Sequence, residues 1–166
     1  MSVATYTPQR GGGRLQLLPL EDCCEFVAAG RLPPSAGGPP ARPGQVERDA
    51  GGRARLLHFA PGRWLVPAPD APLRARLATL AGAGHGTLVD VSGKWRPVGL
   101  KASVAGAVLA SALDVDLVLS GREVAAVQMF DCPAILARPG TGFELWVAAS
   151  YLYAFTQVVD ALRIRD

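Results

Sequence analysis

The stretch TLVDVSGKWRPVGL, residues 87–100, carries the pattern that decides the fold, because it sets two apolar strand patterns on either side of a turn. Asp90 stands between two valines and is followed by Val-Ser-Gly. An aspartate at the end of a strand readily accepts hydrogen bonds from backbone N–H groups two residues further on. Asp90 and Ser92 are therefore predicted to be structural turn residues. A catalytic role for Asp90 would need a second acid, a histidine or an arginine cluster beside it.

Strand patterns continue on both sides of this stretch. RLLHFAPGRWLVPAP (55–69) predicts a hairpin that turns at Pro61-Gly62, a pair favoured in type II turns. REVAAVQMF (122–130) predicts a further strand, and PAILARPGTGFELWV (133–147) predicts a second hairpin. Near the N-terminus, RLQLLPLEDCCEF (14–26) contains enough leucine for one strand and a turn.

Three segments have the periodicity of amphipathic helices. DAPLRARLATLAG (70–82) begins with Asp70 as a capping residue and ends at Gly82. SVAGAVLASAL (103–113) and SYLYAFTQVVDAL (150–162) each begin with a serine that can cap a helix. The apolar stripe expected to bury the third helix consists of Tyr151, Phe155, Val158, Val159 and Leu162.

This order of elements predicts an α+β fold, in which helices pack on antiparallel sheets. A ferredoxin-like β-α-β-β-α-β core is predicted from Thr87 to Leu162. Between Gly30 and Gly52, glycine and proline supply eleven of twenty-three residues, so this segment is predicted to form neither a helix nor a strand ladder. The chain is thus expected to divide into an N-terminal strand with a Pro/Gly-rich arm (1–54) and an α+β domain (55–166).

The composition indicates which partners to expect. Hydrophobic residues make up 49% of the chain and charged residues 19%, which favours apolar surface covered by another protein. The net charge is only +3 and the basic residues are scattered, so no nucleic-acid partner is expected. No apolar run approaches the roughly 20 residues that span a bilayer, and the first residues lack the apolar core of a signal peptide. We therefore expect no membrane partner and a cytoplasmic location.

Few residues are candidates for chemistry. Of three cysteines, Cys23 and Cys24 are adjacent and are predicted to be buried reduced thiols. No Cys-x-x-Cys occurs and the two histidines lie far apart, so no metal site is predicted. No residue is assigned a catalytic or cofactor-binding role. Trp146 and Tyr153 are predicted to contact a partner protein, because each departs from the apolar pattern of its own element.

A longer segment, LVDVSGKWRPVGLKASVAGAVLASALDVDL (88–117), resembles the folate-binding fold of the glycine cleavage T-protein (aminomethyltransferase) family. The chain resembles still more closely the gamma subunits of heterotetrameric sarcosine oxidases, through an ordered set of motifs between Arg55 and Leu162. These motifs are Trp64-Leu65, Asp90-Val-Ser followed by Trp95, Asp114–Leu117, Pro133–Leu136, Gly142–Leu145 and Ser150-Tyr151.

The resemblance implies a non-catalytic subunit that supports assembly of a flavin-containing complex, which oxidatively demethylates sarcosine. It implies alpha, beta and delta subunits as partners, with FAD, FMN, NAD and tetrahydrofolate bound by those subunits and no cofactor bound by this chain. In T-protein enzymes an acid after a Gly-Gly pair holds the folate pterin. Pro133-Ala134 stands at that position here, and Asp131 lacks the preceding Gly-Gly, so the folate site is predicted to be absent. The alternative is a stand-alone tetrahydrofolate-dependent, aminomethyltransferase-like protein.

Overall fold

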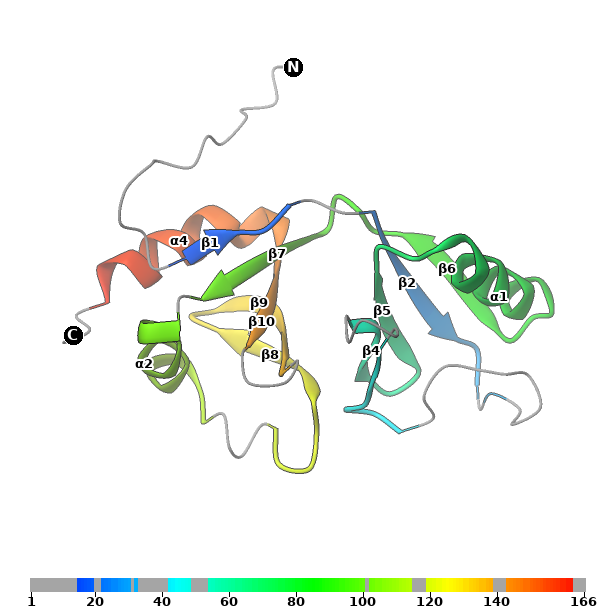
Figure 1. The fold of residues 1–166 in the computed structure, drawn as a ribbon, viewed down its shortest axis with the longest axis horizontal. Helices are drawn as coiled ribbons and strands as arrows, with labels where there is room; N and C mark the ends of the chain where they lie inside the picture. The colour runs from blue at the N-terminus through cyan, green and yellow to red at the C-terminus, as the bar shows by residue number, and fades with distance from the viewer. Residues whose placement is uncertain are drawn as a thin grey trace, which may run out of the picture.

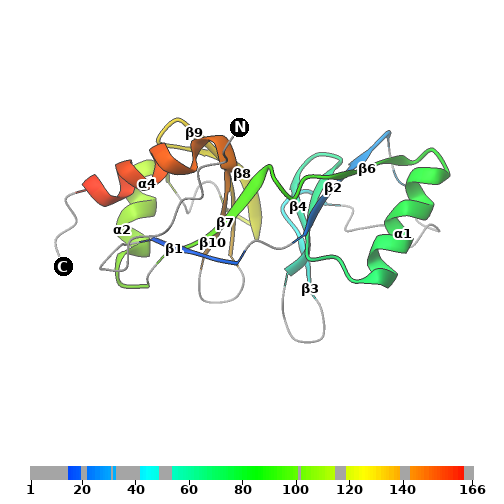
Figure 2. The ribbon, with the colours of Figure 1, turned by 90° about the horizontal axis from the view of Figure 1, so that it is seen from above.

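The computed structural model describes residues 15–19, 22–30, 32, 42–48, 54–100, 102–114, 119–138 and 143–162. They form two five-stranded antiparallel sheets, which lie side by side along the long axis of the molecule (Figure 1). Helices cover the two outer ends, and the view from above shows the same order of layers (Figure 2). Within the described ranges, no helix combines the length and the apolar character needed to cross a bilayer.

Sheet B has the strand order β3-β4-β5-β2-β6 and carries α1 on its outer face. Its elements are β2 (Cys23–Ala28), β3 (Val46–Arg48), β4 (Ala54–Ala60), β5 (Arg63–Pro67), α1 (Ala71–Gly82) and β6 (Gly86–Asp90). The predicted hairpin at Pro61-Gly62 is confirmed, with Gly62 at φ +67° between β4 and β5. The predicted helix start is also confirmed, because the Asp70 carboxylate accepts the N–H of Leu73 at 2.8 Å.

Sheet A has the strand order β1-β7-β10-β9-β8 and carries α2 and α4 on its outer face. Its elements are β1 (Leu15–Leu17), β7 (Trp95–Leu100), α2 (Ala102–Ala112), β8 (Val124–Met129), β9 (Cys132–Ala137), β10 (Glu144–Ala148), the 3-10 turn η2 (Ala149–Tyr151) and α4 (Leu152–Ala161). The chain passes from sheet B to sheet A between β6 and β7.

The core has three layers, one between each sheet and its helices and one between the two sheets. The first fills the space between sheet A and its helices and includes Val108, Leu136 and Phe155. The second lies between the two sheets and includes Leu65 and Trp146. The third lies between sheet B and α1. Because both sheets are covered on both faces, their inner strands are apolar along most of their length rather than strictly alternating.

The α+β class with helices packed on antiparallel sheets is confirmed. In detail, the segment from Thr87 to Leu162 runs β-β-α-β-β-β-α rather than β-α-β-β-α-β. The reason is that β6 pairs with β2 in sheet B, so the first predicted strand of the ferredoxin-like core belongs to the other sheet.

The Pro/Gly-rich stretch from Gly30 to Gly52 lies in large part outside the described residues. Its described part corrects one prediction, because Val46–Arg48 forms β3 and pairs with β4 at the edge of sheet B. These three residues contain neither glycine nor proline, and so they can donate to and accept from a ladder. Strands that precede the predicted boundary at 54/55 join both sheets: β1 joins sheet A, and β2 and β3 join sheet B. The division of the chain into two units at this boundary stays a prediction.

Candidate partner interface

The turn that joins the two sheets contains Asp90 and Ser92. The Asp90 carboxylate accepts the backbone N–H of Ser92 at 2.9 Å and its hydroxyl at 2.7 Å. These two hydrogen bonds hold the pKa of Asp90 below its usual value, because they favour the charged form. The arrangement is that of an Asx turn, in which the side chain takes the place of a backbone acceptor.

The same turn fastens sheet B to sheet A. The Ser92 hydroxyl accepts the N–H of Cys23 at 2.9 Å, and Val91 donates its N–H to the Cys23 carbonyl at 2.8 Å. On the other side, the Lys94 carbonyl accepts the N–H of Ala149 at 2.8 Å, next to the end of β10. The turn therefore links Cys23, the first residue of β2, with Ala149, the residue that follows β10 in sheet A.

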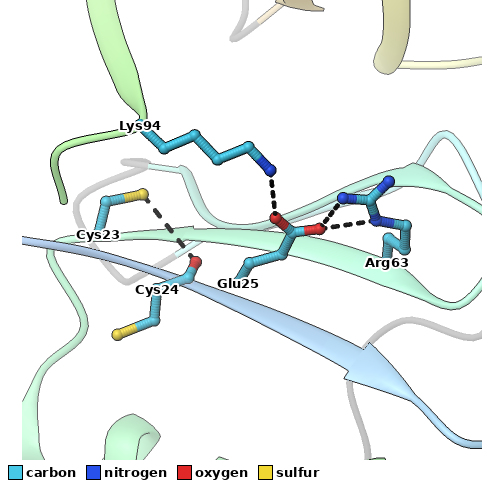
Figure 3. A network of polar contacts seen from close by, with 5 residues as sticks. All are labelled: Cys23, Cys24, Glu25, Arg63 and Lys94. Atoms are coloured by element: carbon cyan, nitrogen blue, oxygen red, sulfur yellow. Dashed lines mark hydrogen bonds and ion pairs between the residues drawn. The ribbon is translucent and has the colours of Figure 1, made fainter. Parts of the chain in front are cut away.

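A buried carboxylate lies beside this turn. Glu25 on β2 is 3% exposed, and its two oxygens are held by Arg63 and Lys94, which approach it from different sides (Figure 3). The Arg63 Nε donates to Oε1 at 2.7 Å, and the Lys94 Nζ lies 3.3 Å from Oε2. The two cations also lie over the rings of Phe59 and Trp95, at 5.3 Å and 5.2 Å from the centroids. A buried carboxylate is tolerated only when it is paired in this way.

Sequence reasoning missed Glu25. The available signal was a single acid inside the apolar strand CCEFVA, a position at which an unpaired charge would be costly. Its partners were not predictable, since Arg63 is 38 residues away and Lys94 is 69 residues away.

The three cysteines are free and buried. Burial, followed by the neighbouring Cys24 thiol, raises the pKa of Cys23 to about 12, and burial also raises the pKa of Cys24 and Cys132. The Cys23 thiol lies 3.9 Å from the Cys24 carbonyl oxygen (Figure 3). Thiols of this kind are weak nucleophiles because the thiolate is disfavoured. Among the described residues, no group of three or more His, Cys, Asp or Glu side chains could hold a metal ion.

The two predicted contact residues lie in different environments. Trp146 is 5% exposed and packs between the two sheets with Trp95 and Ile135, so its ring belongs to the core and offers almost no surface to a partner. The strand β10 is buried on both faces, which is why its alternation did not reveal this. Tyr153 on α4 is 68% exposed and is available to a partner.

The exposed apolar surface of the described chain gathers on α4 and the turn before it. In the described ranges four large hydrophobic side chains are exposed, and three of them belong to this segment. They are Tyr151, Tyr153 and Val158, with exposures of 43%, 68% and 38%. Tyr151 and Val158 thus leave the stripe that was expected to be buried, whereas Phe155 and Val159 are fully buried against sheet A.

The hairpin between β8 and β9 contains Asp131 and Pro133-Ala134, the residues at which the sequence predicts that a folate site is absent. Phe130 and Asp131 form its turn, with φ values of +49° and +61°. Ala134 is 2% exposed and packs in the core behind sheet A. Asp131 therefore lies at the tip of a tight turn.

Comparison with known proteins identifies the fold. No known family profile matches the chain, and no curated protein sequence matches it. A chain of the heterotetrameric sarcosine oxidase from Corynebacterium sp. U-96, solved in complex with pyrrole 2-carboxylate, superposes with a TM-score of 0.66 at 20% sequence identity. The match covers 93% of this chain and 90% of that chain, so the two are similar in length. The predicted resemblance is confirmed at the level of the fold: this protein has the fold of a sarcosine oxidase chain.

Proposed function

We propose that this protein is the gamma-type subunit of a heterotetrameric sarcosine oxidase. The observation that carries the proposal is the match of fold over nearly the full length of two chains of similar size, one of them taken from such an oxidase. A short chain matched end to end corresponds to a whole small subunit rather than to one domain of a large subunit. The motifs between Arg55 and Leu162 support the same choice.

In this proposal the subunit supports assembly and leaves the chemistry to its partners. Two of its acids help to hold the fold: Glu25 in an ion-paired cluster and Asp90 in a turn. The alpha, beta and delta subunits bind FAD, FMN, NAD and tetrahydrofolate. The exposed apolar residues of α4 supply a surface on which such partners can pack.

The test is co-expression of the alpha, beta and delta subunits of the same organism's oxidase with and without this chain. We expect the chain to co-purify in fixed stoichiometry, and its omission to lower the yield of assembled complex while turnover per flavin in the remaining complex stays within about twofold. Failure of the wild-type chain to co-purify would refute the proposal. A loss of turnover at full assembly would show that the subunit acts on the active site.

Calorimetry with tetrahydrofolate tests the alternative of a stand-alone folate enzyme. Because Pro133-Ala134 replaces the expected acid, we expect no saturable binding by the isolated chain. Micromolar binding that is abolished by Asp131→Asn or Asp90→Asn would instead favour the folate enzyme.

A further inference from the structure

The helix α4, together with its flanking residues Tyr151 and Leu162, has two apolar seams, of which sheet A covers only one. The covered seam consists of Leu152, Phe155, Val159 and Leu162, which pack in the core behind sheet A. The second seam consists of Tyr151, Ala154, Val158 and Ala161, and every one of these residues is exposed. We call this second set the outer seam.

The two seams have the same spacing of three, four and three residues. This is the spacing of the a and d positions with which helices pack against one another, and successive residues turn about 100° around the helix axis. The outer seam thus runs along one side of α4, next to the covered seam. A single stripe of about 100° is enough to bury a surface helix on its own sheet. In α4 the apolar arc is roughly twice that width.

The remaining surface of the helix differs in chemistry. Asp160 is exposed on the side of α4 away from both seams, with the exposed Tyr153 beside it, and the exposed Gln157 borders the outer seam, as the 100° rotation per residue requires. The outer seam itself carries no charge, and large side chains alternate along it with alanines. Such a surface leaves shallow gaps over Ala154 and Ala161 that the side chains of another helix can fill.

We infer that the outer seam is the docking site of an amphipathic helix from another chain of the complex, with apolar residues at a and d spacing. This inference rests on the proposed function. From Tyr151 to Ala161 the seam is about 15 Å long, and a helix is about 10–12 Å across, so the seam presents on the order of 150–200 Å². A stable interface needs about 800 Å² from each partner. The seam is therefore too small to hold two copies of this chain together by itself, whereas a larger partner can seat one helix here and make further contacts elsewhere.

The experiment compares Val158→Asp with Gln157→Asp, in the presence of co-expressed alpha, beta and delta subunits of the same organism's oxidase. The two variants introduce the same charge at neighbouring exposed positions of α4, one within the outer seam and one about 100° further round the helix and outside the seam. We expect Val158→Asp to weaken association by about tenfold or more, because it places an unpaired charge in an apolar contact, and Gln157→Asp to leave it within about twofold. A neutral variant, Val158→Gln, should weaken association by a smaller factor.

Circular dichroism and the melting temperature of the isolated variants show whether each is folded, and Val158→Gln replaces Val158→Asp in the comparison if the latter is not. If the wild-type chain associates and the Val158 and Gln157 variants associate equally well, the docking site is refuted and the proposed function stands. If the wild-type chain does not associate, both fall together. If sedimentation of the isolated chain shows a dimer that Val158→Asp dissociates, the seam holds a second copy of this chain and the choice of partner is overturned.

Discussion

Removal of the Ser92 hydroxyl provides the sharpest test of the turn that joins the two sheets. That oxygen accepts the N–H of Cys23, a residue that is 1% exposed. In Ser92→Ala the N–H keeps its place at the start of β2 but loses its acceptor, and the Asp90 carboxylate loses the hydroxyl that donates to it. A buried donor left without a partner costs about 1–3 kcal/mol. For a chain of this size each kcal/mol lowers the melting temperature by about 2–4 °C, so we expect a decrease of roughly 2–12 °C.

The assay is thermal unfolding of wild type and variant, followed by circular dichroism at pH 7, with urea unfolding to give the difference in free energy. Ser111→Ala is the matched control, because the Ser111 hydroxyl donates only to the Ala107 carbonyl on the exposed side of α2. Its removal should change the free energy of unfolding by less than about 0.5 kcal/mol. Equal effects of the two substitutions would refute the reasoning, since they would mean that the Cys23 N–H does not depend on Ser92.

Four further substitutions test single residues. Because hydrogen bonds lower the pKa of Asp90, its carboxylate stabilises the fold above the ordinary aspartate pKa of about 4, and this contribution is lost as the pH falls through the lowered pKa. Unfolding curves of wild type and Asp90→Asn should therefore differ at pH 6 and approach each other as the solution is acidified. Because burial raises the pKa of Cys23 to about 12, the unfolded chain loses this proton first, so stability should fall above about pH 8.5, and less steeply in Cys23→Ala. Gly44 has φ +90°, and a Cβ there would lie 2.6 Å from Cγ of Arg122. Gly44→Ala should therefore destabilise the fold by about 2 kcal/mol or more, as measured by thermal unfolding. Gly106→Ala, which meets nothing within 4 Å in the interior of α2, should instead stabilise by about 0.5–1 kcal/mol.

Local signals were sufficient for the parts of the fold that depend on neighbouring residues. Asp70 caps α1 and Gly62 takes the positive φ of the β4–β5 turn, and both follow from rules that act within four residues. The assignment of strands to sheets was not accessible in this way. The strands β6 and β7 are separated by four residues, yet they join different sheets, because their partners β2 and β10 come from distant parts of the chain.

The sequence predicted which kinds of residue form the candidate interface, but not which of them are exposed. Aromatic and apolar residues of α4 stood out in the sequence, but periodicity alone could not divide them between the sheet and the outside. Val158 and Val159 are adjacent in sequence, and only the placement of sheet A decides that Val159 is buried while Val158 is 38% exposed. The prediction that Trp146 contacts a partner had the opposite difficulty. Its strand β10 is buried on both faces, and most of the residues that cover it are far away in sequence.

The position of β1 has a consequence for the order in which the protein is made. All strands of sheet B come from residues 23–90, so this sheet can be completed while the chain is still on the ribosome. The strand β1 is synthesised first, yet its partner in the register is β7, where Leu15 faces Leu100. At about 5–20 residues per second, the nascent Leu-Gln-Leu segment waits roughly 4–17 s for that partner. During this interval the segment has no strand to pair with, and because β1 is an edge strand of sheet A it can be added to the sheet after the other four strands have paired.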